Sequence, residues 1–299
     1  MGVRTGFGGG VTYGDFGGGS EAYFPCVREW SINPDAQTKK IGCSGSNGAP
    51  IRVAGNLEVT GQFTAYGHTP LIWPGQGFGF IGTVAADEGV SLNTCRVESV
   101  VISCNAESGD PISYVTNFAV SGTPLTELAY GDPADVPDPG PVTTFPSAGL
   151  GVSIDKTSPF SAYVALPEVR SWQLTLTTQN PSYASSGTNA FQSRVAGLLD
   201  ATVQIQGYAD ATDLWSGNLP DIGEIASYRL YVTSSLYYLL DFGFCESKPG
   251  SVDIEGNAIV PYTLNLGLTA FAGTDEGSLV TPGGVTLWSR DLGINYDVS

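Results

Sequence analysis

The chain has 299 residues, 40 of them Gly and 19 Pro, and its 29 acids against 12 Lys and Arg give a formal net charge of −17. A surface of that sign repels phosphate, which argues against stable binding to nucleic acid or to an anionic membrane. No apolar run is long enough to span a bilayer and the first ten residues lack the apolar core of a signal peptide, so we expect synthesis and folding in a cytoplasm.

The composition predicts a mainly β protein. Phe, Tyr, Thr, Val and Ser are frequent, Gly and Pro interrupt them at short intervals, and no long window keeps the apolar spacing of a helix. At the start of the chain, residues 1–20 form a Gly-rich arm around a possible strand at Val11–Phe16. Such an arm packs poorly by itself, so either it lies on a neighbouring subunit or it is disordered.

Strands then alternate with polar segments. Val27–Asn33 and Leu57–Tyr66 alternate apolar and polar residues as half-buried strands do, and a polar loop at Asp35–Ala49 separates them. Gly77–Gly82 satisfies the dinucleotide fingerprint G-x-G-x-x-G, but too few residues follow for the helix that this motif requires. We interpret it as a strand whose glycines allow close backbone approach.

The first half of the chain ends in a hairpin and a linker. Val97–Ala106 and Ile112–Gly122 read as two strands joined by a turn at Glu107–Pro111. Residues 123–150 are rich in Pro and Asp and predict an extended, fairly stiff connection. The expected organisation is therefore a first β domain at 1–122, a linker at 123–150 and a second β domain at 151–299.

An internal repeat supports this division. The stretch Arg52–Tyr66 returns 142 positions later as Arg194–Tyr208, and residues 27–75 and 169–217 share 17 identities in 49 positions without a gap. Trp30 keeps step with Trp172, Trp73 with Trp215, and Glu58 with Asp200. This pattern indicates a tandem duplication.

The second half repeats the same order of elements. Gly151–Ile154 resembles the first strand of the chain, and Asp221–Ser227 is the best candidate for a short helix. The remaining strands are expected at Trp172–Thr177, Arg194–Tyr208, Tyr228–Phe244 (two strands), Ile254–Asn257, Tyr262–Gly273 and Gly284–Ser289, with a loop at Thr178–Gln192.

The sequence offers little catalytic chemistry. His68 is the single histidine, and the repeat carries Asp210 at that place. Neither a P-loop nor G-x-S-x-G occurs, and the five cysteines lack zinc spacing, so we interpret them as buried small hydrophobic residues. We expect no catalytic, metal or cofactor site and no enzyme activity.

Several short motifs resemble the tail tube (major tail) proteins of long-tailed phages. Trp172-Gln-Leu-Thr-Leu, then Val195-Ala-Gly-Leu-Leu-Asp200, then a closing segment from Tyr262 to Gly273 occur in the order typical of that family. The first half matches more loosely, through Trp30-Ser-Ile32 and Val53-Ala-Gly-Asn-Leu-Glu58. The chain departs from the common family member in carrying two units.

The resemblance implies two β-sandwich or half-barrel domains, each with at most a short helix, whose sheets join between neighbours into a tube. It also implies that rings stack through the loops Asp35–Ala49 and Thr178–Gln192. Two units per chain imply a homotrimer with pseudo-sixfold symmetry. The assembly residues expected in or beside these loops are Asp35, Lys39, Lys40, Ser46, Asn47, Gln179, Asn180, Tyr183 and Asn189.

The sequence therefore predicts a structural virion protein of the tail, assembled in the host cytoplasm. Its partners would be further copies of itself and the tape-measure, tail-terminator and distal-tail proteins, and DNA would pass through the tube without specific binding. Two alternatives stay open: a distal-tail or capsid-decorating protein, and a carbohydrate-binding adhesive β-sandwich. In the adhesive alternative Trp73, Trp215 and Trp288 would be exposed platforms.

Overall fold

The computed structural model describes the greater part of both halves of the chain. The described residues are 10–14, 22–24, 26–36, 38–41, 51–53, 57–67, 70–85, 88–121, 151–157, 160–184, 192–195, 199–210, 217–250, 259–268, 278–281 and 286–289. Their regular structure consists of β-strands, and no helix occurs among them. The expected mainly β fold is confirmed.

The short helix predicted at Asp221–Ser227 is wrong. Residues 221–224 form a turn in which Gly223 has a φ of +86°, and the amide of Glu224 donates to the carbonyl of Asp221 at 3.0 Å. A strand then begins at Ile225. Glycine adopts this left-handed conformation without steric cost, which favours a tight turn here over a helix.

We call described residues 10–121 the first unit and described residues 151–289 the second unit. The first unit contains β1 (Gly10–Gly14), β2 (Ala22–Tyr23), β3 (Val27–Ala36), β4 (Lys39–Ile41), β5 (Ile51–Val53), β6 (Leu57–Tyr66), β7 (Gly77–Ala85), β8 (Glu88–Asn105) and β9 (Ser113–Val120). Its strands pair in the order β2-β1-β7-β8-β9-β6-β3, all antiparallel, while β4 and β5 form a separate ribbon.

The second unit repeats this arrangement and adds a hairpin. Its strands are β10 (Val152–Asp155), β11 (Val164–Ala165), β12 (Val169–Thr178), β13 (Ser182–Ala184), β14 (Gln192–Arg194), β15 (Leu199–Asp210), β16 (Ile225–Tyr231), β17 (Tyr237–Ser247), β18 (Ile259–Leu268), β19 (Ser278–Val280) and β20 (Thr286–Ser289). They pair in the order β11-β10-β16-β17-β18-β15-β12, β13 and β14 form a ribbon, and β19 and β20 extend from β17. The segment expected as a strand at 254–257 lies outside the described residues.

The two units share strand registers as well as strand order. Trp30 lies opposite Phe63 in the β3–β6 pair, and Trp172 lies opposite Ile205 in the β12–β15 pair, 142 positions later. Each pair carries an irregularity at the same place near its start. Cys26 comes just before β3 and Glu168 just before β12. Both have a positive φ, which is uncommon for residues other than glycine.

The later strands of the units also match, but 148 positions apart. A register shift follows Val97 in the β8–β9 pair and Cys245 in the β17–β18 pair. Beyond each shift an Asn side chain donates to a Ser hydroxyl on the neighbouring strand, Asn117 to Ser99 at 2.9 Å and Asn265 to Ser247 at 2.7 Å. The second unit therefore holds six more residues between Tyr208 and Ile225 than the first unit holds between the equivalent residues Tyr66 and Gly77.

This insertion corrects part of the gapless match. Gly75 donates its amide to the carbonyl of Val97, and the amide that makes the equivalent bond to Cys245 is that of Gly223, not Gly217. The residue that structurally matches Trp73 is therefore Asp221, whereas Trp215 lies outside the described residues. The match of Trp73 with Trp215 in the sequence is wrong, because an ungapped alignment ignores the inserted residues.

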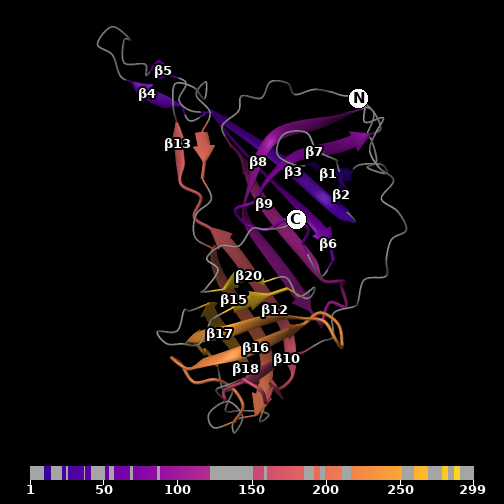
Figure 1. Ribbon diagram of the computed structural model, residues 1–299, viewed down its shortest axis with the longest axis vertical. Coiled ribbons are helices and arrows are strands. Elements are labelled where there is room, and N and C mark those ends of the chain that lie inside the picture. Colours follow the sequence, from indigo (N-terminus) through magenta and orange to yellow (C-terminus); the bar gives the residue numbers. More distant parts are fainter. Residues whose placement is uncertain are drawn as a thin grey trace.

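Each sheet curls around an aromatic core. Trp30 of β3 and Phe80 of β7 lie four strand spacings apart in the hydrogen-bonded order, which would place them about 19 Å apart in a flat sheet. Their ring centroids are 5.9 Å apart. In the second unit, Trp172 and Tyr238 likewise approach to 6.2 Å across three strand spacings. The sheets are thus bent into half-barrels. In Figure 1 the first unit is drawn in indigo to magenta, and the second unit runs from pink through orange to yellow.

Candidate assembly interface

The two units are joined by hydrogen-bonded strands at their edges. Residues Ser99–Asn105 of β8 pair with Ser171–Thr177 of β12, antiparallel and without irregularity, so that sixteen of the described strands form one sheet. We call this pairing the inter-unit seam. A strand edge that is open in one unit is thereby covered by the other, which removes the liability of an exposed edge.

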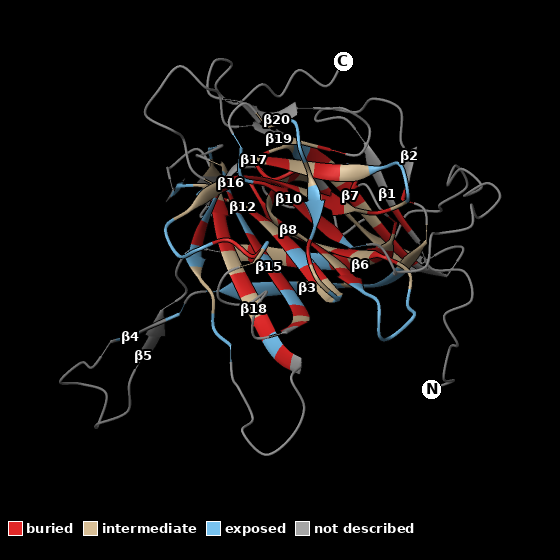
Figure 2. Ribbon diagram, turned by 90° about the horizontal axis from the view of Figure 1, so that it is seen from below, coloured by how far each residue is buried: buried red, intermediate tan, exposed pale blue. Residues whose placement is uncertain are grey.

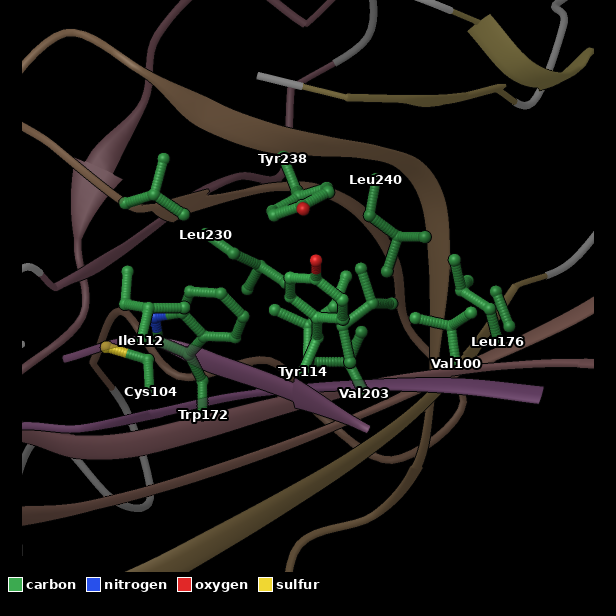
Figure 3. Close-up of a cluster of buried hydrophobic side chains, with 14 of the residues drawn as sticks. Val100, Cys104, Ile112, Tyr114, Trp172, Leu176, Val203, Leu230, Tyr238 and Leu240 are labelled. Carbon is green, nitrogen blue, oxygen red and sulfur yellow. The ribbon is translucent and has the colours of Figure 1, made fainter. Parts of the chain in front are cut away.

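Apolar side chains from both units fill the space above the inter-unit seam. Figure 3 shows Val100, Cys104 and Tyr114 of the first unit beside Trp172 and Leu176 of the second. All five are at most 3% exposed, and they belong to one core that extends through both units. The seam is therefore packed like a protein interior, because a continuous core crosses it.

Arg194 forms an ion-pair cluster next to the inter-unit seam. This residue of β14 in the second unit donates through one guanidinium nitrogen to Glu58 of β6 and through the other to Glu98 of β8, both in the first unit. Its side chain is 9% exposed, and those of Glu58 and Glu98 are 26% and 32% exposed. We call these three residues the Arg194 cluster. Its charges are largely shielded from water, so their attraction is stronger than that of a surface pair.

Polar contacts continue along the same boundary. The backbone amide of Arg194 donates to the hydroxyl of Ser121 at 2.9 Å, and the side-chain amide of Asn180 donates to the carbonyl of Val97 at 3.0 Å. At the far end of the inter-unit seam Arg170 forms an ion pair with Glu107. The seam thus has hydrogen bonds and charge pairs at both ends and an apolar centre.

Strand β12 is paired along both edges, whereas its counterpart β3 is paired along one edge only among the described strands. Among the described strands β3 pairs only with β6, so its second edge has no partner. The inward-facing residues of β12, Trp172, Leu174 and Leu176, are at most 1% exposed. Their counterparts in β3 are half-buried or exposed, and most of β3 is accessible to solvent (Figure 2). The same strand at the same register is buried in one unit and open in the other.

The predicted assembly residues occupy different environments. Ser46, Asn47 and Asn189 lie outside the described residues, and Lys39 and Tyr183 are described only in their backbone, in β4 and β13. Asp35, Lys40 and Gln179 are exposed. Asn180 is half-buried, and its carboxamide links the start of the β13–β14 ribbon to Val97 of the first unit.

The predicted loops contain regular structure that sequence reasoning missed. Strand β3 runs on to Ala36, and the β4–β5 and β13–β14 ribbons extend away from the strand pairs below them (Figure 1). Sequence reasoning also missed the Arg194 cluster. The available signal was that both repeats carry an Arg at the same place, Arg52 and Arg194, and an acid six residues later.

The described residues offer buried thiols but no metal-binding cluster. Burial raises the pKa of the Cys95 thiol, and Cys104 and Cys245 are also buried, so these thiols act as small apolar side chains. No group of three or more His, Cys, Asp or Glu that could hold a metal occurs in the described part of the chain. His68 lies outside it. Nor does the described part contain a helix long and apolar enough to cross a membrane.

The fold and the interface define a class: an all-β chain of two units with matched strand registers, joined edge to edge. No protein-family model and no curated protein matches the chain. Among solved structures it is similar to the tail of an empty GTA particle, determined with C6 symmetry, at a TM-score of 0.32 and 12% identity. That match covers 44% of this chain and 94% of the other. At this TM-score the likeness carries no functional conclusion.

Proposed function

We propose that this chain is a structural virion protein that polymerises into stacked rings and forms a phage tail tube, a conduit for DNA ejection. The observation that carries the proposal is the inter-unit seam. Two units with matched registers associate through edge strands and a packed core, and the edge of β3 equivalent to the covered edge of β12 has no partner among the described strands. A chain that covers one such edge internally and leaves the equivalent edge open can add further copies head to tail.

The proposed ring contains three chains. If the contact between chains repeats the contact within the chain, each chain supplies two of the positions around the axis, and three chains give pseudo-sixfold symmetry. We infer that the two units arose by tandem duplication and constitute domains at 1–122 and 151–299, tied by the linker at 123–150. The matched registers and hydrogen bonds of the two units support this division.

The outward face of the joined sheet suits passage of a polyanion. Its strands present polar and acidic side chains, among them Gln173, Gln204 and Glu246, which line a shallow hollow of about 350 Å³ with Thr175, Thr202 and Asn265. Such a face, in a chain with a net charge of −17, repels phosphate. We place it toward the bore, so that DNA slides through without specific binding.

We assign stacking of the rings to the β4–β5 and β13–β14 ribbons, with the nine predicted assembly residues as contacts. Tape-measure, tail-terminator and distal-tail proteins would meet the ends and the bore of the tube, which assembles in the host cytoplasm. The adhesive alternative has lost support, because Trp73 is only 7% exposed and cannot serve as a platform for sugar.

Negative-stain electron microscopy of the purified protein over a concentration series tests the proposal. Hollow tubes or stacked annuli with threefold or pseudo-sixfold end views are expected. Single rings that never stack would favour the distal-tail or capsid-decorating role. A dispersed monomer at every concentration would overturn self-assembly.

A further inference from the structure

We infer that Arg52 of one chain binds Asp200 and Glu246 of a second copy of this chain, reproducing the Arg194 cluster between molecules. The inference rests on the proposed function, since it concerns the contact through which chains would join. It starts from the fact that Arg194 of the second unit forms ion pairs with Glu58 and Glu98 of the first, across the boundary of the two units.

Each member of the Arg194 cluster has a counterpart of the same charge in the other unit. Glu58 lies opposite Asp35 in the β3–β6 pair, and Asp200 lies opposite Thr177 in the β12–β15 pair, at the equivalent register. Glu98 and Glu246 both occupy the irregularity of their strands, 148 positions apart. Such bulges redirect a side chain, so the two glutamates project from equivalent sites.

The cation is repeated on the other ribbon. Arg194 pairs with Ser182 in the β13–β14 ribbon, and Arg52 pairs with Lys40 in the β4–β5 ribbon, at the same register shifted by 142 positions. The first-unit acids receive their arginine from the second unit. By the same relation, the second-unit acids would receive Arg52 from the first unit of another chain.

Asp200 and Glu246 are available for this contact. Both are exposed, and neither forms an ion pair with any described residue. In the first unit the equivalent pair of carboxylates is bridged by a guanidinium that donates to both, a two-point contact that arginine makes with its planar fork, whereas a lysine would pair as a single point charge. An incoming Arg52 would donate to Asp200 and Glu246 in the same way.

The residues of a second ion pair across the inter-unit seam also have counterparts of the same charge in the other unit. Arg170 is paired with Glu107 across the inter-unit seam, whereas its counterpart Arg28 is exposed and has no carboxylate partner among the described residues. The sequence carries an acid, Glu255, 148 positions after Glu107, outside the described residues. The arginines and acids at the boundary between the two units thus have counterparts at the positions that would face another chain.

Zero-length carbodiimide coupling of the Arg52→Lys variant tests the contact directly. Because the reagent joins an amine to a carboxylate in contact with it, the introduced lysine should couple to Asp200 or Glu246. Mixing isotopically light and heavy chains identifies couplings between molecules by mass spectrometry. The matched control is Arg194→Lys, which should couple to Glu58 or Glu98 within one chain. Coupling of the Arg52→Lys variant to neither acid, in samples that assemble, would overturn the inference.

Charge reversal gives a second measurement. Arg52→Glu should raise the concentration needed for assembly tenfold or more, because breaking a shielded charge pair at an interface typically costs at least that much affinity. Glu246→Arg combined with Arg52→Glu should recover most of the loss. Assembly of Arg52→Glu at the wild-type concentration would overturn this contact and leave the tube proposal standing. Failure of the wild-type chain to assemble would overturn both.

Discussion

The Arg194 cluster allows a quantitative test of how the two units are held together. Replacing Arg194 by Met keeps an unbranched side chain of similar length and removes the charge, so Glu58 and Glu98 lose their shared cation. Removing one partner of a fully buried ion pair costs about 3–5 kcal/mol. Because the two carboxylates are 26% and 32% exposed, water would relieve part of the penalty, and we expect a loss of about 2–3 kcal/mol in the free energy of unfolding.

Urea unfolding followed by circular dichroism, at a concentration where the chain is monomeric, measures this loss. Arg52→Met is the matched control, because it changes the equivalent residue of the other ribbon, whose proposed partners belong to another chain. It should shift the free energy of unfolding of the monomer by less than about 0.5 kcal/mol. Equal effects of the two variants, or an Arg194→Met loss below about 0.5 kcal/mol, would refute the reasoning that charge joins the units.

Two further predictions concern the core and the pH dependence. A Cβ on Gly61 would overlap the ring of Phe118, so Gly61→Val should destabilise the first unit by about 1–3 kcal/mol. Adding Phe118→Leu should recover much of the loss, because Val203 and Leu266 are paired at the equivalent position of the second unit. Thermal melts of the single and double variants check this, and a double variant as unstable as the single would contradict it. Burial opposes ionisation of Asp155, but hydrogen bonds from Thr157 and Ala162 outweigh it and lower the pKa of this carboxyl. The carboxylate should therefore stabilise the fold above its unfolded pKa of about 3.9, and the contribution should fade as the pH falls through the lower folded value. The melting temperature of Asp155→Asn should be below that of the wild type at about pH 6 and approach it toward about pH 2, since the wild-type carboxyl is then protonated; a constant difference would contradict the assignment.

Strand positions were predictable because alternation of apolar and polar residues reflects the geometry of a strand. Leu57–Tyr66 was expected as a strand and is one over the same residues, and the two strands expected within Tyr228–Phe244 are β16 and β17. The turn at Asp221–Glu224 was misread as helical. A periodic pattern over seven residues is too short to decide, whereas the positive φ of Gly223 is a property of the backbone.

The sequence by itself determined that the chain is β-rich, acidic and internally repeated, because composition and local periodicity encode these features. Only the tertiary structure decided where the six extra residues lie, since hydrogen bonds between strands distinguish Gly223 from Gly217 as the partner of Cys245. The two arginines of the repeat look alike in the sequence, and so do β3 and β12. Arg194 is paired and β12 is covered because the chain folds its second unit against its first. This contact joins residues that lie far apart in the sequence. Local pattern contains no information about which of two equivalent edges the chain itself will cover.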